Sequence, residues 1–191
     1  MKTSKIIVGV SNRHIHLSEK DLEILFGRGH KLTKLKNLLQ PGQFAAEETL
    51  TIAGPKGAIE NVRVLGPTRA ESQVEISLSD SFDLGIKAPI RESGDLKKSG
   101  TIVVIGPAGS LIMENKVIIA KRHIHMTPKD AENFNVKDKQ EVAIYIESER
   151  SAQLGNVVIR VSDEYALECH LDLDEANAVG IKNEEYVTIV K

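Results

Sequence analysis

The sequence predicts a mainly β fold of small barrels or sandwiches, capped by short α-helices and arising from an internal duplication. Three observations predict it. Short runs with period-two alternation of apolar side chains recur along the 191 residues. The helical signals between them are brief, which argues against a doubly wound sheet. One motif occurs twice, near residues 14 and 123, each time after an apolar strand and before a capped helix.

The strand signals are short apolar or alternating runs bounded by Gly, Pro, Asn and Asp. Pro55-Lys56-Gly57 lies between two of them and predicts a hairpin turn. Pro107-Ala108-Gly109-Ser110 marks a link before the second copy of the motif. The predicted strands are residues 6–11, 49–53, 59–65, 73–78, 101–105, 117–121, 141–146, 157–161, 168–173 and 186–190.

The helix signals are N-terminal caps followed by short amphipathic stretches. Ser18 begins a sequence that resembles a capping box, and Thr127 is an N-cap followed by Pro at the first helical position. Asp174 can cap a helix over residues 175–179 that stops at Gly180. Residues 80–84 predict one further helical turn.

The composition excludes several function classes. A formal net charge of -2 gives no long-range attraction to nucleic acid or to an anionic membrane. Aromatic residues make up 4% and Trp is absent, which argues against a base-stacking surface. A single cysteine excludes an intramolecular disulfide and fits a reducing compartment. The N-terminal apolar run is too short for a signal sequence or a membrane span, so we expect a cytoplasmic protein.

The repeated motif predicts metal binding. Residues 12–18 read Asn-Arg-His-Ile-His-Leu-Ser and residues 121–127 read Lys-Arg-His-Ile-His-Met-Thr. On a strand, His14 and His16 project from one face, as do His123 and His125, and the isoleucine between them faces the core. The alternative is a pair of surface histidines. Repetition at equivalent points favours zinc, which in catalytic sites takes three protein ligands.

The third ligand of one pair is His170 or Cys169. These neighbours lie in an alternating run, so they face opposite sides of a strand and only one points toward the metal. We favour His170 and interpret Cys169 as a small buried apolar residue. His30 lies in a basic polar loop and is predicted to be an exposed histidine.

Glu75 is a candidate third ligand for the other pair. It is a carboxylate within the otherwise apolar segment Ser72-Gln73-Val74-Glu75-Ile76-Ser77. A carboxylate in such a strand requires a cation or contact with solvent. Sequence spacing alone does not decide between a metal ligand and a solvated strand residue.

Two polar segments have the composition of anion sites. Gly66-Pro67-Thr68-Arg69 places an arginine just after a strand, and Pro89-Ile90-Arg91-Glu92-Ser93-Gly94-Asp95 is a polar turn. Arginine binds phosphate through two parallel hydrogen bonds, and Ser hydroxyls and glycine-rich turns offer further donors. The alternative for both segments is a structural turn with a surface ion pair.

Taken together, these segments resemble the phosphate propanoyltransferase family, the PduL-type phosphotransacylases, over nearly the whole chain. The departures are residues 96–100, where the family has a glycine-rich stretch, and Ala88, where proline is common. The resemblance rests on residues 11–18, 41–45, 66–69, 72–77, 89–95, 120–128 and 174–178.

The resemblance implies two small antiparallel β-barrels with short helices. The first contains residues 1–12 and 121–191, and the second contains residues 13–120 with a helical or loop insert near 18–47. It implies two zinc ions per chain at a dinuclear site. It supports His170 over Cys169 and Glu75 over a solvated residue. One zinc takes His14, His16 and Glu75, the other takes His123, His125 and His170, and Arg69 (binding phosphate) and Ser93 are catalytic.

The implied reaction interconverts a short-chain acyl-CoA, acetyl or propanoyl, plus phosphate with acyl phosphate plus CoA, in acetate metabolism or propanediol degradation. The alternatives are a zinc-dependent hydrolase of thioesters or acyl phosphates and a non-catalytic metal-binding module of microcompartments. Family members that enter microcompartments carry an N-terminal extension, and this chain has no room for one before Ile6. A free cytoplasmic enzyme is therefore expected, and a homodimer is compatible with its edge strands.

Overall fold

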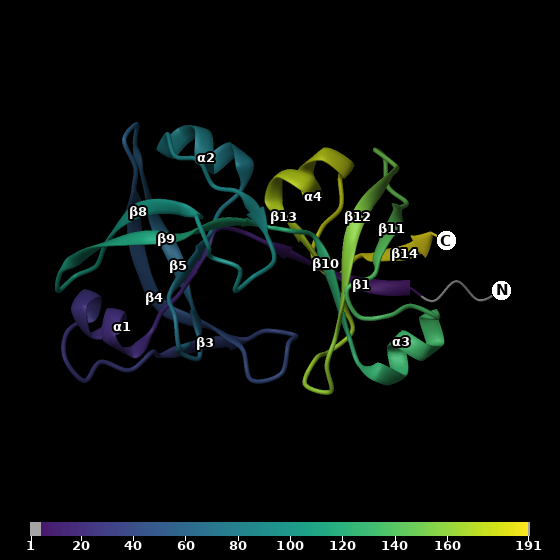
Figure 1. Cartoon of the computed structure of the whole chain (residues 1–191), viewed down its shortest axis with the longest axis horizontal. Helices are drawn as coiled ribbons and strands as arrows, with labels where there is room; N and C mark the ends of the chain where they lie inside the picture. The colour runs from purple at the N-terminus through teal and green to yellow at the C-terminus, as the bar shows by residue number, and fades with distance from the viewer. Residues whose placement is uncertain (1–4, 191) are drawn as a thin grey trace. The chain divides into compact units, whose positions relative to one another are not determined.

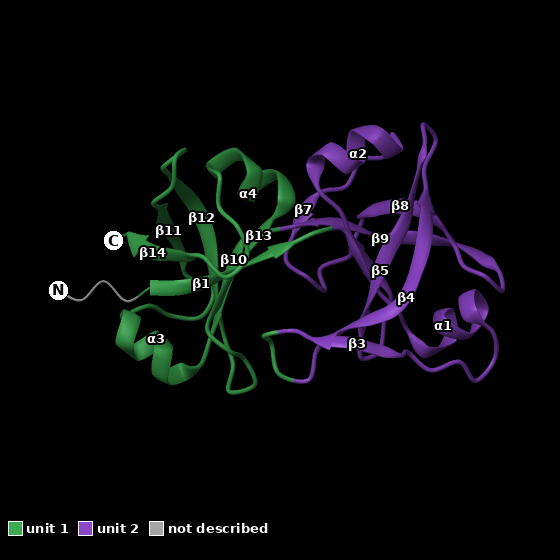
Figure 2. Cartoon of the chain, turned by 180° about the vertical axis from the view of Figure 1, so that it is seen from behind, with its two compact units in different colours: residues 1–12, 39–41, 121–191 green, residues 13–38, 42–120 purple. Residues whose placement is uncertain are grey.

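The structure is a computed structural model and describes residues 5–190 of the chain (Figure 1). These residues divide into two compact units (Figure 2). Unit 1 contains residues 5–12, 39–41 and 121–190, and unit 2 contains residues 13–38 and 42–120. The short segment Leu39–Pro41 thus belongs to unit 1, whereas the sequence-based division assigned it to the insert of the second barrel.

Unit 1 is a closed barrel with the strand order β1, β13, β10, β12, β11 and β14. The β1–β13 and β10–β12 pairs are parallel, and the other neighbours are antiparallel. Two short helices accompany the ring. The elements are β1 (Lys5–Ser11), β10 (His123–Met126), α3 (Pro128–Phe134), β11 (Glu141–Ile146), β12 (Ala152–Val161), β13 (Glu168–Asp172), α4 (Leu173–Val179) and β14 (Tyr186–Val190).

Unit 2 closes in the same way, through β4, β5, β2, β6, β9 and β8, with β8 returning to β4. β3 pairs with β4, and β7 pairs with β9. The elements are β2 (His14–His16), α1 (Glu19–Phe26), β3 (Lys34–Asn37), β4 (Phe44–Ala53), β5 (Ala58–Gly66), β6 (Gln73–Glu75), α2 (Leu78–Leu84), β7 (Ile90–Arg91), β8 (Gly100–Ile105) and β9 (Ser110–Ala120).

The two rings have identical strand order and orientation, as an internal duplication requires. β2 corresponds to β10, because each pairs in parallel with one neighbour and antiparallel with the next. β9 corresponds to β1, although β1 lies at the start of the chain. Each histidine strand is therefore preceded in sequence by a strand of the other unit. The predicted mainly β fold of two small barrels is confirmed, but the barrels are mixed and not purely antiparallel, because each contains two parallel pairs.

Apolar side chains fill the interior of each barrel. Ile15 and Ile124, the central residues of the two histidine motifs, are fully buried in the cores of unit 2 and unit 1 respectively. Their burial confirms that both motifs are strands with the isoleucine facing inward. Since successive side chains point to opposite faces, the histidines on either side of each isoleucine lie on the opposite face of the strand.

Each helix begins at a side-chain cap that follows a strand. Thr127 caps α3 with a complete capping box, and Ser18 caps α1, as predicted. The predicted cap of the last helix, Asp174, is wrong: Asp172 is the N-cap, with Glu175 at the third helical position. Residues 73–78 were predicted as one strand, but Ser77 already caps α2. The strands that carry Glu75 and His170, β6 and β13, therefore both run directly into a capped helix.

No helix among residues 5–190 is both long enough and apolar enough to cross a membrane.

Loss of a core side chain should destabilise the fold far more than loss of an exposed one. Ile52 of β4 is fully buried, so Ile52→Ala should lower the free energy of unfolding by about 2–5 kcal/mol through lost apolar burial and a residual cavity. Ile112 of β9 is 64% exposed, and Ile112→Ala should change the free energy of unfolding by less than about 0.5 kcal/mol. Urea denaturation of both variants measures the difference, and equal losses would contradict the described packing.

Candidate metal centres

In unit 2, the first histidine motif lies on β2, between β5 and β6. In the antiparallel β2–β6 pair, His14 lies opposite Glu75 and His16 lies opposite Gln73. The ligand atoms of His14, His16 and Glu75 all lie within 4.8 Å of one another, and these three residues are called the Glu75 set. Nε2 of His14 is 3.5 Å from Oε2 of Glu75. All three side chains are largely buried, so Glu75 is not a solvated strand residue.

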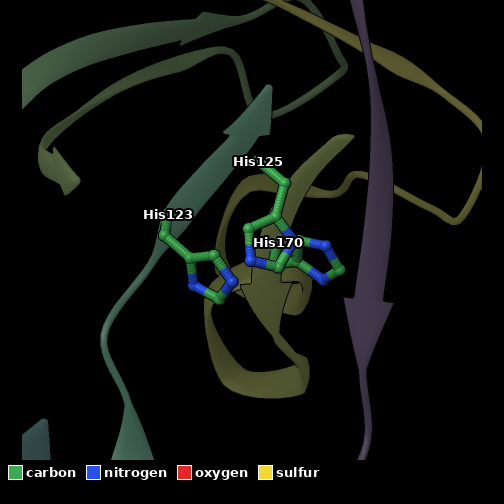
Figure 3. A group of neighbouring side chains, drawn as sticks. All are labelled: His123, His125 and His170. Carbon is green, nitrogen blue, oxygen red and sulfur yellow. The ribbon is translucent and has the colours of Figure 1, made fainter. Parts of the chain in front are cut away.

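In unit 1, the second histidine motif forms the corresponding group with β13. His123 lies opposite His170 in the antiparallel β10–β13 pair. The ring centroids of His123 and His170 are 4.8 Å apart, and those of His123 and His125 are 4.6 Å apart. Figure 3 shows the three imidazoles gathered at one point, with two rings from β10 and one from β13. Their ligand atoms also lie within 4.8 Å of one another, and they are called the His170 set.

Glu75 and His170 occupy the same position in the duplicated fold. Each lies opposite the first histidine of its motif, on the strand that pairs antiparallel with the motif. The same backbone register therefore delivers a carboxylate in one unit and an imidazole in the other.

Cys169, the alternative to His170, faces the other side of β13. It is fully buried in the apolar core of unit 1. Burial raises the pKa of its thiol far above the ordinary value, and the nearby carboxylates of Glu175 and Glu168 raise it further. A thiol kept protonated in a core is neither a ready metal ligand nor a nucleophile.

His30 is not the exposed histidine that the sequence predicts. Its Nε2 lies 2.9 Å from Oε1 of Glu48, and its ring stacks on Phe26 with centroids 4.9 Å apart. The side chain is half-buried and belongs to neither ligand set.

Two of the buried histidines, His16 and His125, are held in the neutral form. Burial lowers the pKa of His16 well below its ordinary value, and the charges of His14 and Arg69 lower it further. The pKa of His125 is lowered to about 2, first by burial and then by His123, His170 and Arg160. Metal ligation requires neutral imidazole, so protons compete weakly with a cation at these positions near pH 7.

Both sets fit a zinc ion. Nδ1 of His16 and both ring nitrogens of His125 are buried polar atoms without a hydrogen-bond partner. A buried polar atom without a partner carries a desolvation cost that a bound cation offsets. Ligand atoms on one tetrahedral zinc lie roughly 3.3 Å apart, a separation that small side-chain rotations reach from the spacing observed here. Three protein ligands per set leave a position open for substrate.

Arg69 and Ser93 lie together beside the Glu75 set. The backbone N–H of Arg69 donates to the carbonyl of Leu17, next to the end of β2, at 2.9 Å. Nη1 of Arg69 donates to Oγ of Ser93 at 3.3 Å, and Nε2 of Gln73 donates to the same oxygen at 2.9 Å. The two predicted anion segments therefore meet at one place, and Gln73 connects them to the ligand strand β6.

The arginine of each motif ties the start of the histidine strand to the helix that follows the third ligand. Nη2 of Arg13 lies 2.7 Å from Oδ1 of Asp80 in α2. Nε of Arg122 lies 2.7 Å from Oε1 of Glu175 in α4. Asp80 and Glu175 are both the third residue of their helix and also complete its capping box. The ion pair thereby holds the two strands of each ligand set together at a second point.

Several residues that lie against the sets carry no strong sequence signal. Gln73 and Glu168 each precede a third ligand by two positions and share its strand face, so period-two alternation identifies them in retrospect. Tyr165 stacks on His125 with centroids 4.1 Å apart, but it lies in a loop that carries no sequence signal. Arg160 lies opposite His125 in the parallel β10–β12 pair, which follows only from the register.

Comparison with known proteins identifies the family. Residues 7–182 match the family model described as phosphate propanoyltransferase. A phosphate propanoyltransferase of Thermotoga maritima is 59% identical over 191 residues, covering 100% of this chain and 91% of that protein. The enzymes of that name from Clostridioides difficile and Salmonella typhimurium are each 51% identical, covering 100% and 96% of this chain and 91% and 87% of their own lengths.

The resemblance inferred from the motifs thus extends along almost the entire sequence, through both barrels and all six residues of the two ligand sets. The chain belongs to the phosphate propanoyltransferase family of acyltransferases.

Proposed function

We propose that this protein is a zinc-dependent phosphate acyltransferase with two zinc ions, one held by each ligand set. It interconverts a short-chain acyl-CoA, acetyl or propanoyl, plus phosphate with acyl phosphate plus CoA. The reaction class comes from the family, and two ligand triads at equivalent register positions support the metal requirement. Zinc bound there would act as a Lewis acid toward phosphate and carbonyl oxygens and orient them.

Arg69 is the residue proposed to bind phosphate. Its guanidinium is permanently charged and offers donors in a planar fork that matches two phosphate oxygens. Its backbone N–H donates to the carbonyl of Leu17, next to His16, and its charge lowers the pKa of His16. Ser93 accepts hydrogen bonds from both Arg69 and Gln73, so it restrains the guanidinium from the side of the β7 turn. Phosphate held in this way has lost most of its orientational freedom before it reacts.

The chemical step is a direct transfer. A phosphate oxygen attacks the thioester carbonyl carbon, a C–O bond forms, and the C–S bond then breaks to release CoA as a thiolate that takes a proton. The carbonyl oxygen carries negative charge in between, and positive groups fixed nearby stabilise it. The chain's single cysteine is fully buried in the unit 1 core, so it does not form an acyl-enzyme.

Thiol release separates the proposal from its two alternatives. The transferase should release CoA from propanoyl-CoA only when phosphate is present, and the product should be propanoyl phosphate. A zinc hydrolase would release CoA without phosphate, and a non-catalytic metal-binding module would release none. A thiol-reactive dye assay with and without phosphate measures this. Phosphate-independent release would replace the proposal with the hydrolase.

Removal of the Arg69 guanidinium should disable phosphate use while leaving the fold intact. Arg69→Ala should lower phosphate-dependent kcat/KM by about 100-fold or more, as loss of a preorganised charged donor does. The matched control is Arg150→Ala, which removes an exposed arginine near α4 and should leave the rate unchanged. Unchanged kinetics in Arg69→Ala would remove this residue from the site.

Each ligand set should hold its metal independently. Elemental analysis should find about two zinc ions per wild-type chain, and His14→Ala or His123→Ala should each reduce the content to about one. His30→Ala, which alters a histidine outside both sets, should retain both ions. Full activity in a zinc-free protein would contradict the metal requirement.

A further inference from the structure

Each third-ligand strand carries a second buried polar residue on the same face, two positions before the ligand. In β6 this residue is Gln73, and in β13 it is Glu168. They lie opposite the second histidine of each motif, His16 and His125 respectively. Gln73 and Glu168 are therefore equivalent positions of the duplicated fold, just as Glu75 and His170 are.

In unit 2, both polar atoms of the Gln73 side-chain amide make hydrogen bonds. Its Nε2 donates to Oε1 of Glu75 at 2.5 Å and to Oγ of Ser93 at 2.9 Å. Its Oε1 accepts from the backbone N–H of Gly94 at 2.8 Å. The neutral amide thus donates to a carboxylate that belongs to the Glu75 set, and the turn after β7 fixes its orientation.

In unit 1, the residue two positions before the ligand is the carboxylate, and the ligand is the imidazole. Oε2 of Glu168 lies 3.1 Å from Nε2 of His170, and it accepts a hydrogen bond from Nε2 of Gln40 at 2.7 Å. Gln40 is itself fixed by two hydrogen bonds to the backbone of Ala166. A Cβ at Gly9, which lies opposite His170 in β1, would collide with the Glu168 carboxylate. The absence of a side chain at Gly9 therefore leaves the space that the Glu168 carboxylate occupies.

The carboxylate occupies a different one of the two positions in each unit: it is Glu75, opposite the first histidine, in unit 2, and Glu168, opposite the second histidine, in unit 1. Glu75 is a direct member of its set beside the neutral Gln73, whereas the imidazole of His170 lies beside the charged Glu168. Each set thereby has one buried carboxylate, Glu75 as a member of its set and Glu168 beside a member of the other. An uncompensated divalent cation in a buried site is costly, so one negative charge per site favours retention of zinc.

We propose that Glu168 is the positioning residue of the His170 set: it fixes the His170 ring and supplies the negative charge that Glu75 supplies directly in the other set. This inference rests on the proposed zinc requirement. A carboxylate hydrogen-bonded to a ligand histidine raises the basicity of the ligand and sets its ring orientation, and its loss commonly weakens metal binding 10–100-fold. Gln40 does not contact His170 in this scheme and acts through Glu168, because its hydrogen bond orients the carboxylate.

The test is the affinity of each zinc ion in Glu168→Gln. The variant should fold, since the equivalent position of unit 2 already carries glutamine. Competition of the purified protein against a chromophoric chelator gives the affinity of both zinc ions. We expect one of them to weaken about 10–100-fold and the other to remain unchanged. Co²⁺ substitution gives a second readout, because the visible spectrum of one of two bound ions should change.

The matched control is Glu141→Gln, which neutralises an exposed carboxylate on β11 of the same unit and should leave both affinities unchanged. A second variant, Gln40→Leu, keeps the carboxylate and removes its donor, and it should weaken the same zinc to a smaller extent. Thermal unfolding of the zinc-free variants reports on the fold separately.

The outcomes are distinct. Two unchanged zinc affinities in Glu168→Gln would overturn the positioning role, and if that variant does not fold, unchanged affinities in Gln40→Leu would do so. Failure of the wild-type protein to bind zinc at the His170 set would instead overturn the proposed function. Loss of stability without loss of zinc affinity would show that Glu168 has a structural role only.

Discussion

The register of one antiparallel strand pair in each barrel determines both candidate metal sites. A strand of three or four residues presents two histidines on one face, and its neighbour brings a third ligand opposite the first histidine. A shift of one residue would turn Glu75 or His170 into the apolar core, because the side-chain period is two. Ile15 and Ile124, fully buried beneath the histidines, resist such a shift. The core thus fixes the register, and the register fixes the ligands.

The duplication made part of this arrangement predictable. His-Ile-His on a strand specifies two ligands by local geometry alone, and its recurrence before a second capped helix marks a second site. The third ligands depend on which distant strand becomes the neighbour, and spacing does not encode this. His170 was separable from Cys169 because adjacent strand residues face opposite sides, whereas Glu75 had no such local criterion. Only the β2–β6 pairing places it opposite His14.

The fold was predictable wherever burial imposes alternation. Residues 101–105 and 186–190 were recognised within a residue of β8 and β14. β3 was missed because all four of its residues are exposed, which leaves no apolar alternation to detect. The cap at Asp172 was missed because Asp174 offers the same chemistry two residues later, and only backbone conformation distinguishes them. Leu39–Pro41 belongs to unit 1, where Gln40 donates to Ala166 and Glu168, and no local pattern predicts this position.

The two ligand sets resemble each other in the charges around them more closely than in residue identity. Arg69 acts on the Glu75 set, and Arg160 acts on the His170 set through His125, yet they come from different places on the barrel. Glu75 and Glu168 likewise provide one carboxylate per set from different positions of the third-ligand strand. With zinc bound, each site would then combine a divalent cation, one carboxylate and one arginine, and both would attract an anionic phosphate.

A direct carboxylate ligand lowers the Lewis acidity of its metal more than a carboxylate acting through histidine. With zinc bound, the His170 set would therefore hold the stronger electrophile, and the Glu75 set lies beside Arg69, the residue proposed to bind phosphate.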